Sequence, residues 1–195
     1  MTDSIGKNLA ALPGVTLIVR RGAYLESFTQ SILSGDVSLQ GMDALLLHVG
    51  TNNIDRDRDP QSVLIETGNL IRVAKVANPT MHVVVSGILP RICDLSATEG
   101  LVKEYNKLLG RVCRDNQVMM IRSFTAFTCG KEPNGIKAWL FAADGLHLSP
   151  RGSAVLTQLF RVQFSDRNIQ QRHFVMKNEL AKKNLRDENF GFNMV

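Results

Sequence analysis

The chain has 195 residues, which is enough for one well-buried core and short for two. Hydrophobic residues make up 44% of it and charged residues 21%, a globular balance that excludes wholesale disorder. The longest apolar runs, such as 44–47 and 83–85, fall far short of the roughly 20 residues that a membrane-spanning helix needs.

The charge limits the classes of partner. A net charge of +5 permits contact with RNA or anionic lipid and requires neither. The basic residues form no run long enough for a nucleic-acid arm, and an aromatic content of 6% offers no evident platform for base stacking. A surface with a mild basic excess is the first interpretation, and RNA binding through a basic surface is the second.

The cysteines and the first residues indicate in which cellular compartment the protein resides. Cys93, Cys113 and Cys129 are an odd number without metal-like spacing, which predicts reduced thiols and neither disulfides nor zinc. Residues 1–14 lack the basic start and apolar block of a secretory signal. We therefore expect a cytoplasmic protein with no transmembrane segment.

Strand-like and helix-like segments alternate along the chain. The expected strands are 15–19, 44–49, 82–88 and 118–121, and the expected helices are 5–12, 24–33, 60–77, one that follows a capping box at Ser96 and Glu99, and one that begins at Ser149-Pro150. The continuous apolar run 44–49 is typical of a strand buried on both faces. This alternation predicts a three-layer α/β/α sandwich with a parallel sheet, whose chemistry lies beyond the C-terminal strand ends.

The composition changes near residue 165. Residues 166–189 are densely polar with sparse apolar positions, which predicts a surface helix or tail. We therefore expect one domain over 1–164 and a polar C-terminal segment over 165–195.

Three short stretches at predicted strand ends could carry chemistry. Ser4 precedes a helix, where it is either a plain N-cap or a nucleophile near the positive end of the helix dipole. Asn52 follows strand 44–49, where it either forms a turn or points an amide donor into a cleft. His147 lies three residues after Asp144, so the carboxylate can orient the imidazole.

Other side chains have structural and functional interpretations side by side. Arg91 and Arg151 could bind an anionic substrate group or be solvated. Trp139 and Phe141 could line an acyl pocket or pack under the following loop. His48 and His82 lie inside predicted strands and are interpreted as core or edge residues of the sheet, not as ligands.

Taken in order, Asp3-Ser4, Gly22, Gly50-x-Asn52 and Asp144-x-x-His147 resemble the four blocks of the SGNH, or GDSL-like, hydrolases. The sequences around Asn52 and His147 also resemble esterase-like domains encoded by some animal retroelements. The resemblance covers residues 2 to 164 and implies a flavodoxin-like α/β/α fold.

The resemblance implies a role for each matching residue. Ser4 would be the nucleophile, His147 the general base and then acid, and Asp144 the residue that orients His147. The backbone N–H groups of Ser4 and Gly22 and the side-chain amide of Asn52 would form the oxyanion hole. No metal or organic cofactor is implied.

Two departures from the family pattern stand at the start of the chain. Thr2 takes the place of the usual Gly, and only Met1 precedes it where the family's first, central strand is expected. A missing strand would leave its two neighbours unpaired. Either the chain is a fragment of a longer open reading frame, or another segment fills the slot, or the domain is damaged, and we favour the fragment.

The leading hypothesis is a serine esterase or acylhydrolase acting on small acyl or lipid esters through an acyl-enzyme. The alternative is a catalytically weak or inactive module of the same fold that binds RNA or a protein partner. The sequence leaves acyl length and oligomeric state open.

Overall fold

The computed structural model describes residues 1–10, 14–54 and 59–163. Its elements are η1 (Ser4–Asn8), α1 (Leu25–Leu33), β1 (Ala44–Leu47), α2 (Pro60–Ala77), β2 (His82–Ser86), α3 (Leu95–Asp115), β3 (Met119–Ile121), α4 (Ser123–Ala126), η2 (Pro133–Gly135), η3 (Ala138–Leu140) and α5 (Pro150–Gln163). Two units are distinguished, Met1–Thr157 and Gln158–Val195. In the second, the description covers only the end of α5, and the predicted polar segment 165–195 lies outside the described residues.

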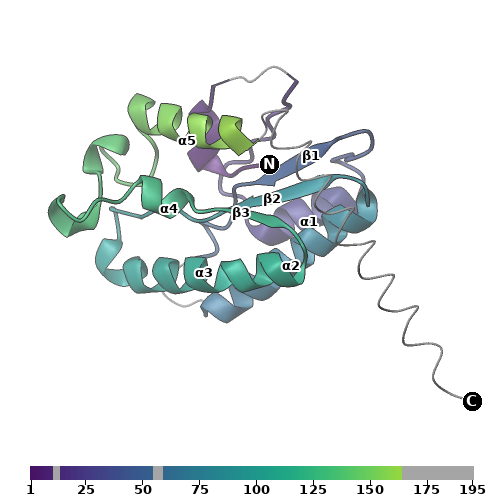
Figure 1. Cartoon of the computed structure of the whole chain (residues 1–195), viewed down its shortest axis with the longest axis horizontal. Helices are drawn as coiled ribbons and strands as arrows, with labels where there is room; N and C mark the ends of the chain where they lie inside the picture. The colour runs from purple at the N-terminus through teal and green to yellow at the C-terminus, as the bar shows by residue number, and fades with distance from the viewer. Residues whose placement is uncertain (11–13, 55–58, 164–195) are drawn as a thin grey trace, which may run out of the picture. The chain divides into compact units, whose positions relative to one another are not determined.

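A parallel sheet forms the centre of the first unit. Its strands run in the order β1-β2-β3, with Leu45 beside Val83 and Val85 beside Met120. Figure 1 shows α1, α2 and α3 on one side of the sheet, and η1 (purple) and the first turns of α5 on the other. The predicted α/β class with a parallel sheet is confirmed.

The first two residues lie where the family's central strand is expected. The Met1 amine donates to the Leu46 carbonyl at 2.7 Å, and the His48 N–H donates to the Met1 carbonyl at 3.0 Å. On the other side, the Thr2 N–H donates to the Ile18 carbonyl at 2.9 Å, and the Arg20 N–H donates to the Thr2 carbonyl at 3.0 Å. These bonds join the chain around Ile18 to the sheet.

The predicted strand 15–19 is wrong in extent. Only Val19 forms a bridge, to Thr2, and Val15 and Leu17 are 51% and 42% exposed. The physical reason is that, among the described residues, the sheet-like pairing of this segment is limited to the bonds of Thr2 with Ile18 and Arg20. A run of β-branched residues becomes a strand only where a neighbouring backbone pairs with it.

Strand β1 is buried mainly on one face. Leu45 and Leu47 are buried against the core that includes Phe28 and Leu70, while Ala44 and Leu46 are half-buried. The expectation of burial on both faces is therefore corrected, because the face opposite the core is only partly covered.

Two helix starts differ from expectation, and two agree. Helix α3 begins at Leu95 with Asp94 as its N-cap, so the predicted capping box at Ser96 lies inside the helix. The predicted helix 5–12 is a short 3-10 turn, η1, capped by Asp3. Helices α2 and α5 begin at Pro60 and Pro150 as predicted, because proline lacks an N–H that the first helical turn would leave unbonded.

His48 lies in the core, which is one of the two positions predicted for it. It is 3% exposed, its Nδ1 lies 2.8 Å from the Ser86 hydroxyl, and that hydroxyl lies 2.7 Å from the Ser123 hydroxyl. Burial lowers the pKa of His48 to about 4, so the ring is neutral at physiological pH. The contact connects the end of β1 to the end of β2 and the start of α4.

Thr2, which replaces the family's glycine, packs against a glycine in η1. A Cβ built on Gly6 would lie 2.4 Å from the Thr2 side chain, which is 1% exposed. Gly6 therefore leaves the space that the Thr2 side chain occupies.

We expect Gly6→Ala to destabilise the protein by about 1–3 kcal/mol through overpacking against Thr2. In the double variant Thr2→Gly/Gly6→Ala, the two costs should not add, because Thr2→Gly removes the side chain that the new methyl group would meet and that methyl group fills part of the void. Urea unfolding of the single and double variants measures this coupling. Strictly additive costs would show that Thr2 and Gly6 do not compete for one space.

Candidate active site

Three of the four motif regions follow strands or bridges with parallel pairing, and the fourth, Asp144–His147, lies in the loop between η3 and α5. Asp3-Ser4 follows the Met1-Thr2 pairing, Gly22 follows the bridge at Val19, and Asn52 follows β1. The Asn52 side-chain amide donates to the Ala23 carbonyl at 2.9 Å, which joins the second region to the third.

Asp144 and His147 form a hydrogen-bonded pair. Asp144 Oδ2 lies 2.7 Å from His147 Nδ1, while Oδ1 accepts the backbone N–H groups of Leu146 and His147 at 3.0 and 2.9 Å. These bonds, with that of the Leu146 N–H the largest, lower the pKa of Asp144 to about 2. The carboxylate is therefore ionised near neutral pH, and it leaves His147 Nε2 as the ring atom for proton transfer.

The loop that carries this pair is anchored on both sides. Phe141 and Leu148 form an antiparallel bridge, and the Ala142 N–H donates to the His147 carbonyl at 2.8 Å. Ser149 caps α5 by accepting the Gly152 N–H at 3.1 Å. Gly152 is required here, since a Cβ would lie 1.9 Å from the Leu140 carbonyl oxygen.

Ser4 is half-exposed and is the first residue of η1. The Asp3 carboxylate, not the serine hydroxyl, caps this turn by accepting the Ile5 N–H at 3.0 Å. No hydrogen bond between Ser4 and His147 is formed within the described part of the chain. The structure thus brings together Asp144 and His147, and it leaves Ser4 without a direct bond to that pair.

The Asp3 carboxyl group is buried next to Ser4, and groups from other motif regions influence its pKa. Asp3 is 1% exposed, and burial raises the pKa of its carboxyl group to about 6. The backbone N–H groups of Ile5 and Thr51, and then the charges of His147 and Arg91, oppose this rise. The residue next to Ser4 therefore lies within electrostatic range of both the Asn52 loop and His147.

The predicted oxyanion donors differ in their surroundings. Gly22 is exposed in a turn with φ of 67°, a conformation that suits glycine. Among the described residues, neither the Ser4 nor the Gly22 N–H has a backbone acceptor. Asn52 is half-buried, and since its amide carries two hydrogens, one remains after the bond to Ala23.

Sequence reasoning missed Asn53, whose side chain attaches the Asn52 loop to α1 and α2. Asn53 is fully buried, its Oδ1 accepts the Leu25 N–H at 3.0 Å, and its Nδ2 donates to Glu66 and Glu26 at 2.7 and 3.0 Å. One signal for this role was the start of α1, where Tyr24 supplies no capping oxygen of the Ser, Thr, Asp or Asn type.

Arg91 is neither solvated nor available to a substrate anion, so both interpretations from the sequence are wrong. Its side chain is 14% exposed, and it donates to the Thr51 and Ile54 carbonyls and to Asp94. Phe141 packs in the core against Phe127, with ring centroids 5.7 Å apart, whereas Trp139 is 51% exposed.

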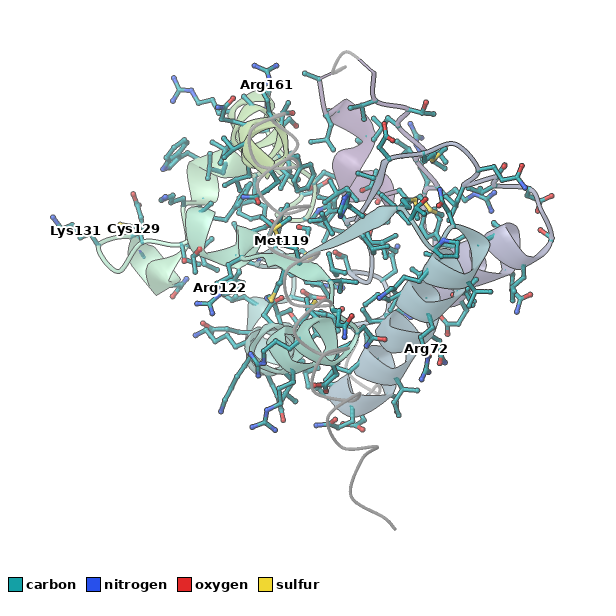
Figure 2. All side chains as sticks on the ribbon, turned by 45° about the vertical axis from the view of Figure 1, so that its right-hand side comes forward. Arg72, Met119, Arg122, Cys129, Lys131 and Arg161 are labelled. Carbon is teal, nitrogen blue, oxygen red and sulfur yellow. The ribbon has the colours of Figure 1, made fainter. Side chains whose placement is uncertain are left out.

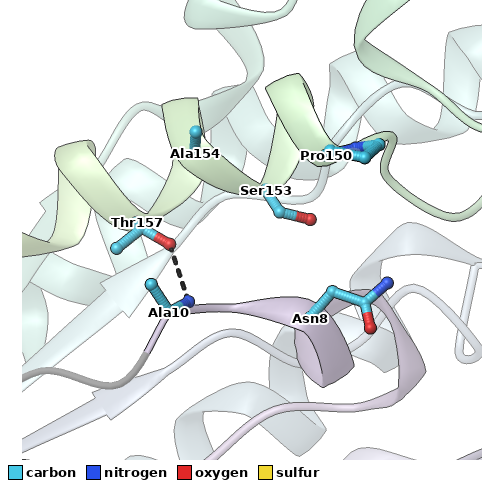
Figure 3. Close-up of a pocket in the computed structure, with 6 residues that line it drawn as sticks. All are labelled: Asn8, Ala10, Pro150, Ser153, Ala154 and Thr157. Carbon is cyan, nitrogen blue, oxygen red and sulfur yellow. Dashed lines mark hydrogen bonds between the residues drawn. The ribbon is translucent and has the colours of Figure 1, made fainter.

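A cavity of about 290 Å³ lies between η1 and the start of α5 (Figure 3). Its lining residues are Asn8, Ala10, Pro150, Ser153, Ala154 and Thr157. The Ala10 N–H donates to the Thr157 hydroxyl at 3.2 Å across it. None of the predicted catalytic side chains lines this cavity.

Comparison with known proteins agrees with this arrangement. The model of the GDSL-like Lipase/Acylhydrolase family matches residues 3–155. The chain belongs to this family. Its match spans all four motif regions, from Asp3-Ser4 to Asp144–His147.

Solved structures with the same fold share little sequence with this family member. A lipolytic G-D-S-L family protein from Veillonella parvula is 18% identical with a TM-score of 0.68, covering 85% of this chain and 96% of its own. A lipase/acylhydrolase from Enterococcus faecalis is 18% identical with a TM-score of 0.61, covering 82% and 90%. A carbohydrate esterase family 3 protein from Talaromyces cellulolyticus is 16% identical with a TM-score of 0.62, covering 82% and 78%. No curated protein matches the chain in sequence.

We expect Asp3 to make stability depend on pH. Its folded pKa of about 6 lies above the ordinary 3.8, so the stability it contributes is present below about pH 4 and lost as pH rises through about 6. In urea unfolding, the wild type should lose on the order of 2 kcal/mol relative to Asp3→Asn between about pH 4 and about pH 7. A difference that stays constant over that range would show that Asp3 is not desolvated.

Proposed function

We propose that the chain is a serine esterase of the GDSL-like family that cleaves small acyl or lipid esters through an acyl-enzyme. The observation that carries this is the Asp144–His147 pair, at 2.7 Å, on a loop that hydrogen bonds of residues 91–93 connect to the loop of Asn52. Such a pair serves a nucleophile that lacks a low pKa of its own, as a serine does.

The reaction follows from the roles of these residues. Ser4 Oγ attacks the ester carbonyl while His147 Nε2 takes its proton, and Asp144 stabilises the imidazolium that forms. The N–H groups of Ser4 and Gly22 and the amide of Asn52 stabilise the negative oxygen of the tetrahedral intermediate. His147 then gives its proton to the leaving alcohol. Water hydrolyses the acyl-enzyme in the same way, which releases the carboxylic acid and restores Ser4.

The half-exposed position of Ser4 fits a substrate that arrives from solvent. Contact between Ser4 and His147 would then form when substrate binds, because catalytic hydrogen bonds are often long in free enzymes. No metal or organic cofactor is part of this proposal.

The finer predictions of the sequence stay predictions. These are the likeness to retroelement-encoded esterase domains, a cytoplasmic location and RNA binding. No described helix is long and apolar enough to cross a membrane. Figure 2 shows Arg72 of α2 apart from Arg122 and Lys131, which lie just before and a few residues after α4. The Asp144–His147 hydrogen bond favours the esterase proposal over an RNA-binding module, which has no use for such a pair.

The test is hydrolysis of p-nitrophenyl acetate by the purified chain. Ser4→Ala should lower kcat/KM by about 10³-fold or more, since it removes the nucleophile. Ser38→Ala, at an exposed serine between α1 and β1, is the matched control and should keep wild-type activity. Equal activity in wild type and Ser4→Ala would refute the assigned nucleophile.

A further inference from the structure

The segment between β2 and α3 lies between the two loops that carry Asn52 and His147. It leaves the C-terminal end of β2, the strand next to β1, so it emerges beside the loop 50–54. Arg91, Ile92 and Cys93 form its second half, just before the Asp94 cap of α3.

Arg91 holds the loop that carries Asn52. Its Nη1 donates to the Thr51 carbonyl at 2.6 Å and to the Ile54 carbonyl at 2.8 Å, on both sides of Asn52. Its Nε and Nη2 face the two carboxylate oxygens of Asp94, with Nε to Oδ1 at 3.0 Å. A planar guanidinium can make all these bonds at once, which a lysine ammonium cannot.

The next two residues hold the other loop. The backbone N–H groups of Ile92 and Cys93 both donate to the Gly145 carbonyl, at 2.8 and 3.2 Å. Gly145 lies between Asp144 and His147 with φ of 67°, and a Cβ there would lie 2.9 Å from the Cys93 nitrogen. The two backbones are therefore in close contact.

In the part of the chain that the structure describes, no hydrogen bond joins the Asn52 loop directly to the Asp144–His147 loop. The connection runs through three consecutive residues, with a side chain on one side and two backbone amides on the other. The position of Asn52 relative to His147 thus depends on where Arg91 sits.

We propose that Arg91 is a positioning residue that sets the oxyanion-hole amide of Asn52 against the catalytic pair. This rests on the proposed esterase function. Arg91 touches neither substrate nor reacting atoms, and it acts through the loop 50–54. A displacement of about 1 Å in such a donor is enough to lose most of its effect on the transition state.

The kinetic test is a double-mutant cycle on kcat for p-nitrophenyl acetate. Asn52→Ala should lower kcat by about 10²–10³-fold and Arg91→Ala by about 10–10²-fold, with little change in KM, since the lost interaction is specific to the transition state. In the double variant, the Arg91 substitution should cost little more, because the donor it positions is already gone. Multiplicative losses would overturn the proposal.

Two further variants test whether the effect depends on the geometry of the guanidinium and is specific to this arginine. Arg91→Lys keeps the charge but not the fork toward Asp94, and its kcat should lie between those of wild type and Arg91→Ala. Arg111→Ala, at an exposed arginine of α3, is the matched control and should keep the wild-type kcat. If Arg91→Lys keeps the wild-type kcat, the planar guanidinium is not needed, and the positioning role assigned to its bonds is overturned.

Hydrogen exchange separates this proposal from the proposed function. The N–H groups of Asn53 and Ile54 both donate to the Gly50 carbonyl, so they report the order of the loop. Their exchange should be about 10-fold faster in Arg91→Ala or Arg91→Lys than in wild type and Arg111→Ala. Unchanged exchange overturns the positioning role. If the wild type hydrolyses no ester but exchange is still faster in the Arg91 variants, the esterase proposal is refuted and the role of Arg91 in ordering the loop is retained.

Discussion

The backbone pairing of Met1 and Thr2 is the constraint on which the rest of the site depends. Their hydrogen bonds to Ile18, Arg20, Leu46 and His48 join two parts of the sheet and place Asp3 and Ser4 at its C-terminal edge. The pairing is short, so the segment before Val19 stays exposed instead of extending the sheet. Thr2 also forms a steric contact with η1 through Gly6, and η1 carries the predicted nucleophile.

Much of the fold followed from the periodicity of the sequence. The strands around Leu45 and Val84 and the helices that begin at Pro60 and Pro150 are determined locally, by apolar patterning and by the backbone limits of proline. Strand 15–19 failed because its outcome depends on a distant backbone partner, whereas the capping box at Ser96 failed although the contacts at the start of α3 are local. Val15 needs a paired backbone, and the start of α3 depends on Asp94, whose carboxylate binds Arg91.

The site divides in the same way. Asp144 and His147 were predictable because they are three residues apart in one turn, so their contact is local. The roles of Asn53 and Arg91 were not predictable, because their partners are distant in the sequence. Asn53 bonds Glu66, which is 13 positions away, and Glu26, which is 27 positions away. Arg91 bonds Thr51, which is 40 positions away. Buried polar side chains that hold loops are recognised only once the loops are placed in space.

The most direct measurement of the central claim is covalent labelling of the nucleophile. The chain is incubated with a fluorophosphonate, which reacts with serines that a histidine activates, and the modified residue is located by peptide mass spectrometry. The account predicts a single adduct on Ser4 that is lost in His147→Ala. An adduct on another serine, or labelling of Ser4 that is unaffected by His147→Ala, would contradict it.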